Sequence, residues 1–495
     1  MQIYNENEAR AYARTLSFVL AKAIADIMPG CTLIVEHSLG NGQYCEIQGA
    51  KYVGPHDIER LKKRMRELID ASIPIIQERL PRERAIELFE QHGRKETAKI
   101  LQYRTVDDVN VYHLDDMIDY FYEPIYLNTG DVKVFDLLPY PPGLILLYPK
   151  AGQPGVLPVF KDLPKLAAIF KETEEWARIL GVNYVSSLND AISRGEASEL
   201  ILISEALHEK HISDIADMIA RNKEQIRLIS IAGPSSSGKT SFAGRLYIQL
   251  RVNGIKPLRI SLDNYFLPRD YAPLDENGQP DFEALEALDL ELFNQQLKAL
   301  IEEDEVSMPV FNFKTGTRSY MPPIRLEPDQ PIIIEGIHGL NEKLTRAVHK
   351  DRKFKIYVSA LTQINIDEHN RVPTTYMRLL RRLVRDSQFR SADAVHTLER
   401  WASVRAGEEK NIFPYQEEAD VMFNSSLAYE ASLLKRYVEP LLNSVPDSCP
   451  QRSMAVQLLD MLSHFVAITP EKEVNIPSNS LIREFIGHSC FFGKN

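Results

Sequence analysis

The sequence has 495 residues, more than one hydrophobic core normally holds, so we expect two to four domains. Its 44% hydrophobic and 26% charged residues are typical of a soluble globular protein, and a formal net charge of −11 argues against general nucleic-acid binding. The four cysteines are too scattered for a zinc knuckle or a disulfide framework, and no apolar run is long enough to span a bilayer. We therefore expect a cytoplasmic protein that binds no membrane.

The first region, residues 1–150, is predicted to be an α+β domain. Apolar residues at helical spacing indicate helices around 18–27 and 58–69, and apolar runs at 32–35 and 43–47 indicate strands joined by a turn at 40–42. Proline and glycine at 149–158 mark a hinge into a mostly helical connector, residues 151–222. Residues 425–495 also carry helical patterns and are predicted to form a C-terminal extension that packs on the core.

Two pairs of residues invite a metal-site interpretation. His208 and His211 have the spacing of ligands on one helix face, but no third ligand is nearby, so two solvated polar residues is the simpler interpretation. His488 and Cys490 near the C-terminus pose the same choice, and a buried, unreactive cysteine is the more common outcome.

Residues 233–240 match the phosphate-binding pattern GxxxxGK[ST] without a mismatch. An apolar run at 226–232 precedes them and a helical pattern follows, which gives the strand, loop and helix that the pattern requires. Small residues let backbone amides point at phosphate oxygens, Lys239 would reach the outer phosphates, and the Thr240 hydroxyl would bind Mg²⁺. The predicted ATP-binding residues are Gly233, Pro234, Ser235, Ser236, Ser237, Gly238, Lys239, Thr240 and Ser241.

Two acidic residues follow further predicted strands, Asp263 after 258–262 and Glu335 after 331–334. Strands that alternate with helices predict a doubly wound, mainly parallel α/β core over residues 223–424, with its ligand crevice at the carboxyl ends of the strands. We expect Asp263 to accept the proton of an attacking hydroxyl or to hold Mg²⁺ through water, and Glu335 to order Mg²⁺ together with Thr240. A turn-capping role is the alternative for Asp263.

Arginines recur along the predicted helix that begins near residue 378. Arg378, Arg382 and Arg385 share one face, and the run continues to Arg390. A solvated face of ion pairs is one interpretation. We favour a lid formed by Arg382, Arg385 and Arg390, because guanidinium groups suit phosphate contact and a lid must bring positive charge to a triphosphate.

Five ordered segments between residues 228 and 424 resemble the uridine kinase and phosphoribulokinase group of P-loop kinases. Beside the phosphate loop, residues 263–266 resemble its catalytic-acid segment, 281–289 its substrate-side segment, 309–318 its pyrimidine-reading segment and 382–386 its lid. The resemblance implies ATP and Mg²⁺ as cofactors and Asp263 and Lys239 as catalytic residues. The substrate-binding residues that it implies are Tyr265, Phe282, Phe311 and Arg318.

The sequence departs from this group at two positions, because the Tyr and His that help to read a pyrimidine are Phe311 and Gly316 here. We therefore predict phosphorylation of a nucleoside 5′-hydroxyl, with uridine or cytidine as the first choice. The motifs support the kinase reaction better than they support this substrate. A kinase of another small hydroxyl compound, such as a sugar phosphate, stays open. So does a nucleotide-gated protein that binds RNA or an amino acid, and a homo-oligomer is also left open.

The N-terminal domain resembles the editing domain of threonyl-tRNA synthetases in segments 14–21, 119–125 and 129–135. The resemblance implies an HxxxH pair on the first helix and a Cys and a His near the second segment. Here these positions hold Arg14, Phe18, Phe121 and Ile125, none of which offers a neutral imidazole or a thiolate. We expect a binding or scaffolding module without hydrolytic activity.

Overall fold

The computed structural model describes residues 5–268, 271–274, 278, 280–312, 315–362 and 364–491. The chain forms two compact units. Unit 1 comprises Met1–Ala197, Thr362–Pro373 and Ala455–Ile468, and unit 2 comprises Ser198–Leu361, Thr374–Met454 and Thr469–Asn495. Two later pieces of the chain thus belong to the N-terminal unit, whereas the sequence suggested consecutive domains. Those consecutive boundaries remain a prediction.

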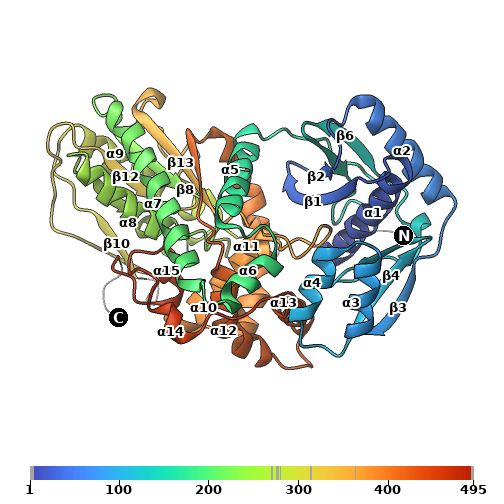
Figure 1. The fold of residues 1–495 in the computed structure, drawn as a ribbon. Helices are drawn as coiled ribbons and strands as arrows, with labels where there is room; N and C mark the ends of the chain where they lie inside the picture. The colour runs from blue at the N-terminus through green and yellow to red at the C-terminus, as the bar shows by residue number, and fades with distance from the viewer. Residues whose placement is uncertain are drawn as a thin grey trace. The chain divides into compact units, whose positions relative to one another are not determined.

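Unit 1 is an α+β body built on two antiparallel sheets (Figure 1). One sheet has the order β1 (Thr32–Leu39), β2 (Gly42–Gln48), β7 (Gly143–Leu147), β6 (Asp136–Tyr140), and the other the order β3 (Ile76–Pro81), β4 (Asp108–Leu114), β5 (Met117–Tyr120). Its helices are α1 (Glu6–Ile27), α2 (Pro55–Asp70), α3 (Arg82–Gln91), α4 (Lys95–Tyr103), α5 (Pro164–Leu180), α6 (Val185–Ser193) and most of α13 (Arg452–Leu462). The two helices and two strands expected before residue 70 are confirmed.

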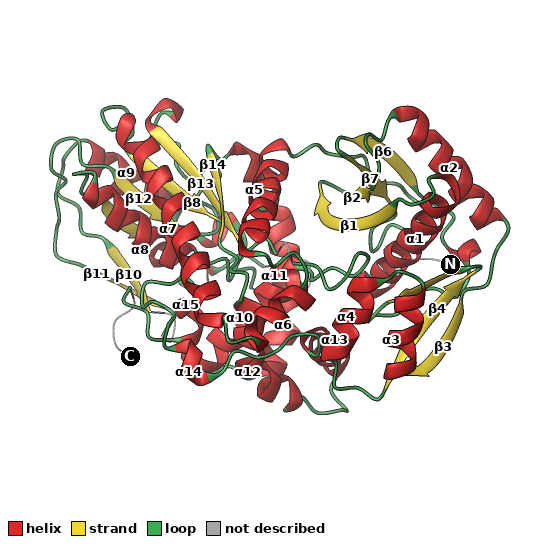
Figure 2. Ribbon diagram, viewed as in Figure 1, coloured by secondary structure: helices red, strands yellow, loops and turns green. Residues whose placement is uncertain are grey.

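Unit 2 is a parallel five-stranded sheet with helices on both faces (Figure 2). The strand order is β14 (Val421–Asn424), β13 (Lys353–Ser359), β8 (Leu228–Ala232), β12 (Ile332–Glu335), β9 (Leu258–Ser261). A hairpin of β10 (Pro309–Asn312) and β11 (Thr317–Tyr320) accompanies this sheet. The helices are α7 (Ala197–Arg221), α8 (Lys239–Val252), α9 (Leu290–Ile301), α10 (Thr374–Phe389), α11 (Ala394–Asn411), α12 (Glu430–Asn443), α14 (Pro470–Glu473) and α15 (Arg483–Ile486).

Alternation along the strands explains the two helical layers of unit 2. Ile229 and Ile333 point to the face covered by α7 and α8, whereas Leu228, Ile332 and Ile334 point to the face covered by α9. The prediction of a doubly wound parallel core is therefore confirmed. The helices after residue 425 confirm the helical C-terminal region.

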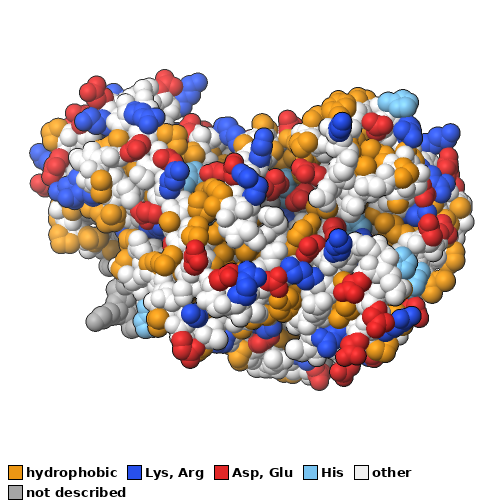
Figure 3. All heavy atoms as spheres, viewed as in Figure 1, with side chains coloured by type: hydrophobic (Ala, Val, Ile, Leu, Met, Phe, Trp, Pro, Cys, Tyr) orange, Lys and Arg blue, Asp and Glu red, His pale blue; other side chains and the backbone are white. Residues whose placement is uncertain are grey.

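The distribution of surface charges and the hydropathy of the helices agree with the amino-acid composition. Acidic and basic side chains are interspersed over the face seen in Figure 3. Among the described residues, no helix is long and apolar enough to cross a membrane.

His208 and His211 lie on α7 where this helix covers the sheet, so the interpretation of two solvated residues was wrong. The His208 side chain is 1% exposed and its ring centroid lies 5.2 Å from that of Phe423 on β14. The ring of His211 lies 5.3 Å from the same phenylalanine. Burial, aided by the charge of Arg245, holds the pKa of His208 well below its usual range.

We predict that His208 makes the stability of unit 2 depend on pH. Its ring stays neutral in the folded state, whereas in the unfolded state it takes up a proton near pH 6.5, so its stabilising effect is lost as the pH falls below about 6.5. Between pH 7.5 and 5.5, His208→Gln should lose less free energy of unfolding than wild type, by up to about 1.4 kcal/mol per pH unit. Urea unfolding at the two pH values measures this difference.

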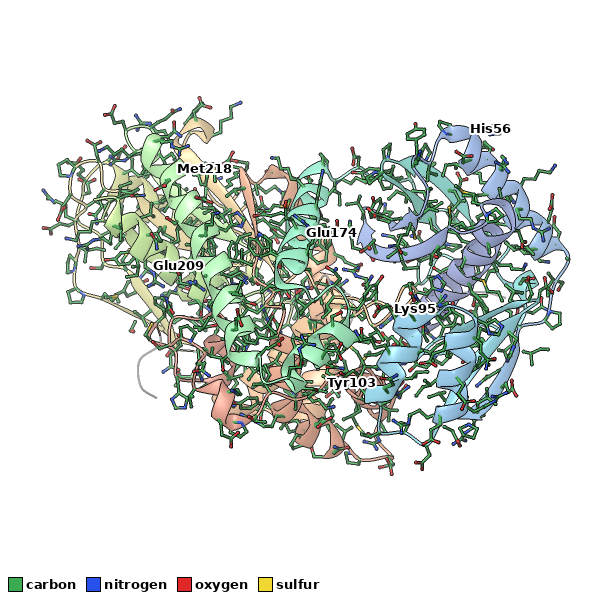
Figure 4. All side chains as sticks on the ribbon, viewed as in Figure 1. His56, Lys95, Tyr103, Glu174, Glu209 and Met218 are labelled. Carbon is green, nitrogen blue, oxygen red and sulfur yellow. The ribbon has the colours of Figure 1, made fainter. Side chains whose placement is uncertain are left out.

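The matched control is His56→Gln, which changes an exposed histidine on α2 (labelled in Figure 4). It should keep the pH dependence of wild type. An equal loss of stability in wild type and His208→Gln would contradict the prediction.

Candidate functional site

The phosphate loop begins where β8 ends, at the carboxyl edge of the parallel sheet. Two glycines are required there by geometry. A Cβ atom on Gly233 would lie 1.9 Å from the backbone oxygen of Val358, and Gly238 has φ +83° immediately before α8. The loop is therefore held against β13 at its first residue and turns into the helix at its last, which leaves Lys239 as the first residue of α8.

The register of the sheet brings both predicted carboxylates to this edge. Glu335 on β12 pairs with Ile231 on β8 and with Ser261 on β9, so the phosphate loop and Asp263 each follow a residue level with Glu335. The Glu335 carboxylate accepts hydrogen bonds from Ser261 (Oγ–Oε1 3.0 Å) and from Thr240 (Oγ1–Oε2 3.4 Å). The two residues predicted to organise Mg²⁺ thus lie in direct contact.

The charges at this edge act on one another. Burial raises the pKa of Glu335 to about 7, and the nearby carboxylate of Asp263 adds to this rise while the Lys239 ammonium opposes it. Desolvation likewise raises the pKa of Asp263, opposed first by Lys239 and then by Arg390 and Arg385. Burial lowers the pKa of Lys239. The structure therefore brings the predicted catalytic and metal-binding groups together, and their assigned roles remain proposals.

Two glutamates that the sequence did not single out hold donors of the phosphate loop. The backbone N–H of Ser235 donates to Glu408 of α11 (3.0 Å), and the N–H and hydroxyl of Ser241 donate to Glu484 of α15 (3.2 and 3.0 Å). Lys239 donates to the carbonyl of Pro234 in its own loop (3.0 Å). Glu408 and Glu484 lie 173 and 243 positions from their partners, so no local motif could indicate them.

The arginines of α10 divide into two groups. Arg378 and Arg381 are 1% and 0% exposed, form ion pairs with Glu408 and Glu430, and donate to the carbonyls of Ser235 and Ser236. Both arginines therefore hold the backbone of the phosphate loop, and neither belongs to the predicted lid.

The three predicted lid arginines, Arg382, Arg385 and Arg390, form ion pairs with one carboxylate, Asp386, at 3.2, 2.9 and 3.7 Å. Arg382 also donates to the Ser235 hydroxyl (2.9 Å). Burial lowers the pKa of Arg382 to about 10, and the charge of Arg385 acts in the same direction. The lid role remains a prediction: Asp386 holds the three arginines together, and Arg382 also reaches the phosphate loop.

The predicted substrate residues are not equivalent. The Phe282 and Phe311 rings both contact Phe266, with centroids 6.4 and 6.1 Å apart, and together form a small aromatic group. Tyr265 is 1% exposed, packs on Phe293 and donates its hydroxyl to Gln296, so its side chain belongs to the core. The neighbour of the Phe282 and Phe311 rings is therefore Phe266, whereas the sequence analysis predicted Tyr265 as a substrate-binding residue.

Arg318 contacts protein groups rather than an open site. It donates to the Asp289 carboxylate (2.9 Å) and to the carbonyls of Tyr265 (3.2 Å) and Phe266 (2.9 Å). These bonds fix the segment that follows Asp263. The geometry therefore gives Arg318 a positioning role, and its contact with substrate remains a prediction.

In unit 1, the four positions that correspond to editing-site residues are filled by structural contacts. Arg14 forms an ion pair with Glu123 and donates to the carbonyl of Pro124. The rings of Phe18 and Phe121 lie edge to face at 5.6 Å in the core, where Ile125 is also buried. An ion pair and a hydrophobic cluster replace groups that would hold or activate water.

A profile described as the Phosphoribulokinase / Uridine kinase family matches residues 228–430. The uridine kinase of Bacillus pumilus is 28% identical over 196 residues, which are 39% of this chain and 84% of that protein. A solved structure described as a possible uridine kinase from Bacillus stearothermophilus is 19% identical and covers 43% of this chain and 98% of its own, with a TM-score of 0.29. A score this low supports no structural conclusion.

The N-terminal part is similar to a different protein. The threonine–tRNA ligase of Aromatoleum aromaticum is 32% identical over 120 residues, which are 24% of this chain but only 19% of that ligase. For the kinase region, the uridine kinase of Lactobacillus johnsonii is 30% identical over 196 residues, 84% of its length. With the sheet, phosphate loop and carboxylates of unit 2, this similarity shows that the chain belongs to the phosphoribulokinase and uridine kinase family.

Proposed function

We propose that this protein is an ATP-dependent kinase that phosphorylates the 5′-hydroxyl of a nucleoside, with uridine or cytidine as the preferred acceptor. The observation that carries the proposal is the convergence of Lys239, Asp263 and Glu335 at the phosphate loop. Phosphoryl transfer needs positioning and neutralised charge more than covalent chemistry, and these groups can supply both.

The residues at the loop fit an anionic nucleotide. The N–H groups of Ser235 and Ser241 donate to carboxylate oxygens, so both already bind an anionic group. Thr240 and Glu335 would hold Mg²⁺, which when bound neutralises charge on the phosphates. Lys239 would bind the outer phosphate oxygens. Asp263 would accept the proton of the acceptor hydroxyl.

Asp263→Asn tests the proton-accepting role. The amide keeps the shape of the side chain but cannot take a proton, so kcat should fall by about 10²- to 10⁴-fold while ATP affinity changes little. Labelled-ATP transfer assays and ATP titration measure the two quantities. Asp304→Asn, an exposed change after α9, serves as the control and should be fully active. Unchanged turnover in Asp263→Asn would exclude the assigned role.

Glu484 is expected to compete with the nucleotide for the start of α8. Its carboxylate accepts from the Ser241 N–H and hydroxyl and places a negative charge where phosphate would bind. Glu484→Gln should therefore lower the Kd for ATP by about 2- to 5-fold, as expected for one charge at a helix N-terminus. Glu471→Gln, which changes an exposed glutamate of α14, should leave the Kd unchanged. Weaker ATP binding in Glu484→Gln would show that this carboxylate supports the loop instead.

The acceptor is tested by a panel of nucleosides, sugars and sugar phosphates with labelled ATP. The Phe266, Phe282 and Phe311 group offers rings on which a base can stack but neither hydroxyl nor imidazole donors, so we expect uridine and cytidine to be used with modest discrimination between bases. Phe311→Ala should lower kcat/KM for nucleosides, and Phe389→Ala, an exposed phenylalanine, should not. Exclusive use of a sugar phosphate would overturn the nucleoside assignment.

A further inference from the structure

Unit 1 contains a pocket that phosphoryl transfer does not use. It has a volume of about 320 Å³ and is lined by residues of β1, β2 and α5, among others. Its lining includes three carboxylates, those of Glu36, Glu46 and Glu174, beside the apolar Ile34 and Ala177. Glu174 is labelled on α5 in Figure 4. None of these residues belongs to the four positions that correspond to the editing site.

A β-bulge in β1 places Glu36 in the lining of this pocket and its neighbour His37 next to it. Between the pairs Val35–Cys45 and Ser38–Gln43, β1 contributes Glu36 and His37 where β2 contributes Tyr44 alone. Neighbours on a regular strand point to opposite faces, but the extra residue of a bulge redirects one of them. As a result, a ring nitrogen of His37 and carboxylate oxygens of Glu36 and Glu174 all lie within 4.8 Å of one another.

The imidazole of His37 is held rigidly and lacks a partner at one nitrogen. The side chain is 4% exposed and stacks on Phe170 of α5, with ring centroids 3.7 Å apart and planes at 16°. Its Nδ1 atom has no hydrogen-bond partner among the described residues. A buried polar atom without a partner is costly, and burial favours the neutral ring, which is the form that binds metal ions.

The charges around the pocket are not balanced by protein groups. Glu36 interacts with the carboxylates of Glu174 and Glu46 and with one guanidinium, that of Arg371. Arg371 in turn donates to the carbonyl of Thr362 and lies over the Phe170 ring. The Tyr44 hydroxyl donates to Glu46 (2.7 Å) and so orients that carboxylate. Three carboxylates face one guanidinium and, at Glu174, the ammonium of Lys171, which still leaves an excess of negative charge that a cation would compensate.

We propose that Glu36, His37 and Glu174 bind a divalent transition-metal ion, Zn²⁺ or Mn²⁺. Two carboxylates and one neutral imidazole are ligands that both ions accept, whereas Mg²⁺ prefers oxygen ligands alone. A set of three protein ligands leaves coordination positions open towards the pocket, as in metal sites that bind water or a small ligand.

Metal binding to the full-length, tag-free protein tests this proposal. After treatment with a chelator and without nucleotide, titration with ZnCl₂, MnCl₂ or MgCl₂ should show about one tight site per chain for Zn²⁺ or Mn²⁺ and weaker binding of Mg²⁺. Glu36→Gln with Glu174→Gln should weaken that site by more than about 100-fold, since both anionic ligands are lost. Glu175→Gln removes an exposed carboxylate on the same helix and should bind as wild type does.

Two further measurements distinguish the proposed metal site from the nucleotide site and from a folding defect of the double variant. Glu335→Gln should retain the site, because the nucleotide site contributes no ligand, and loss in this variant would assign the metal to the nucleotide site instead. If the double variant folds poorly, the Co²⁺-loaded wild type should show visible absorption bands that change in His37→Gln. Equal affinity in the double variant and Glu175→Gln, or an unchanged Co²⁺ spectrum in His37→Gln, would overturn the proposal.

Discussion

The site in unit 2 depends on charge compensation at the carboxyl edge of one parallel sheet. Lys239 is partly withdrawn from water, and the carboxylates of Glu335, Glu484 and Asp263 favour its charged form there. The charge of Asp263 disfavours the ionised form of Glu335, and the ammonium of Lys239 opposes the rise of the pKa of both carboxylates. Only the parallel register of β8, β12 and β9 brings the three groups level.

A second layer of charges fixes the loop that carries Lys239. Arg378 with Glu408 and Arg381 with Glu430 are fully buried pairs, and both arginines also donate to carbonyls of the loop. Such pairs add little net stability, but removing one partner typically costs about 3–5 kcal/mol because the other charge stays buried. These pairs therefore fix the conformation of the phosphate loop, because a movement of the loop would break a hydrogen bond of a buried guanidinium group.

The sequence could predict the parts of this site that are encoded locally. The phosphate loop, the strands that end in Asp263 and Glu335, and the parallel core follow from motifs and periodicity within short windows. Glu408 and Glu484 could not be predicted in this way, because each meets the loop only through the fold. The sequence also could not predict that Tyr265 packs in the core while its neighbour Phe266 contacts the other rings, or that His208 is buried. In both cases a distant element, α9 or β14, determines which face of the segment is covered.

The same limit applies to unit 1, where residues far apart in sequence complete one core. The segment Thr362–Pro373 supplies the carbonyl of Glu368 to the Val35 N–H of β1. It also places His369 against Asp119, a buried carboxylate that Arg94 binds as well. Without the segment, Asp119 would lose the ring of His369 as a hydrogen-bond partner and β1 would lose one of its hydrogen bonds at the bulge. No pattern within the first 150 residues indicates that need.

The carboxylates of Glu408 and Glu484 on the phosphate loop are best understood as placeholders. A backbone N–H buried without a partner is costly, so donors directed at phosphate need acceptors when no nucleotide is bound. A carboxylate satisfies them with a single negative charge, whereas a triphosphate carries several and also meets Lys239. Replacing these carboxylates by a triphosphate is therefore favourable. The net affinity for the nucleotide is nevertheless lowered, because the glutamates have to be displaced first. Because Glu484 belongs to α15, we expect the C-terminal region to take part in setting nucleotide affinity.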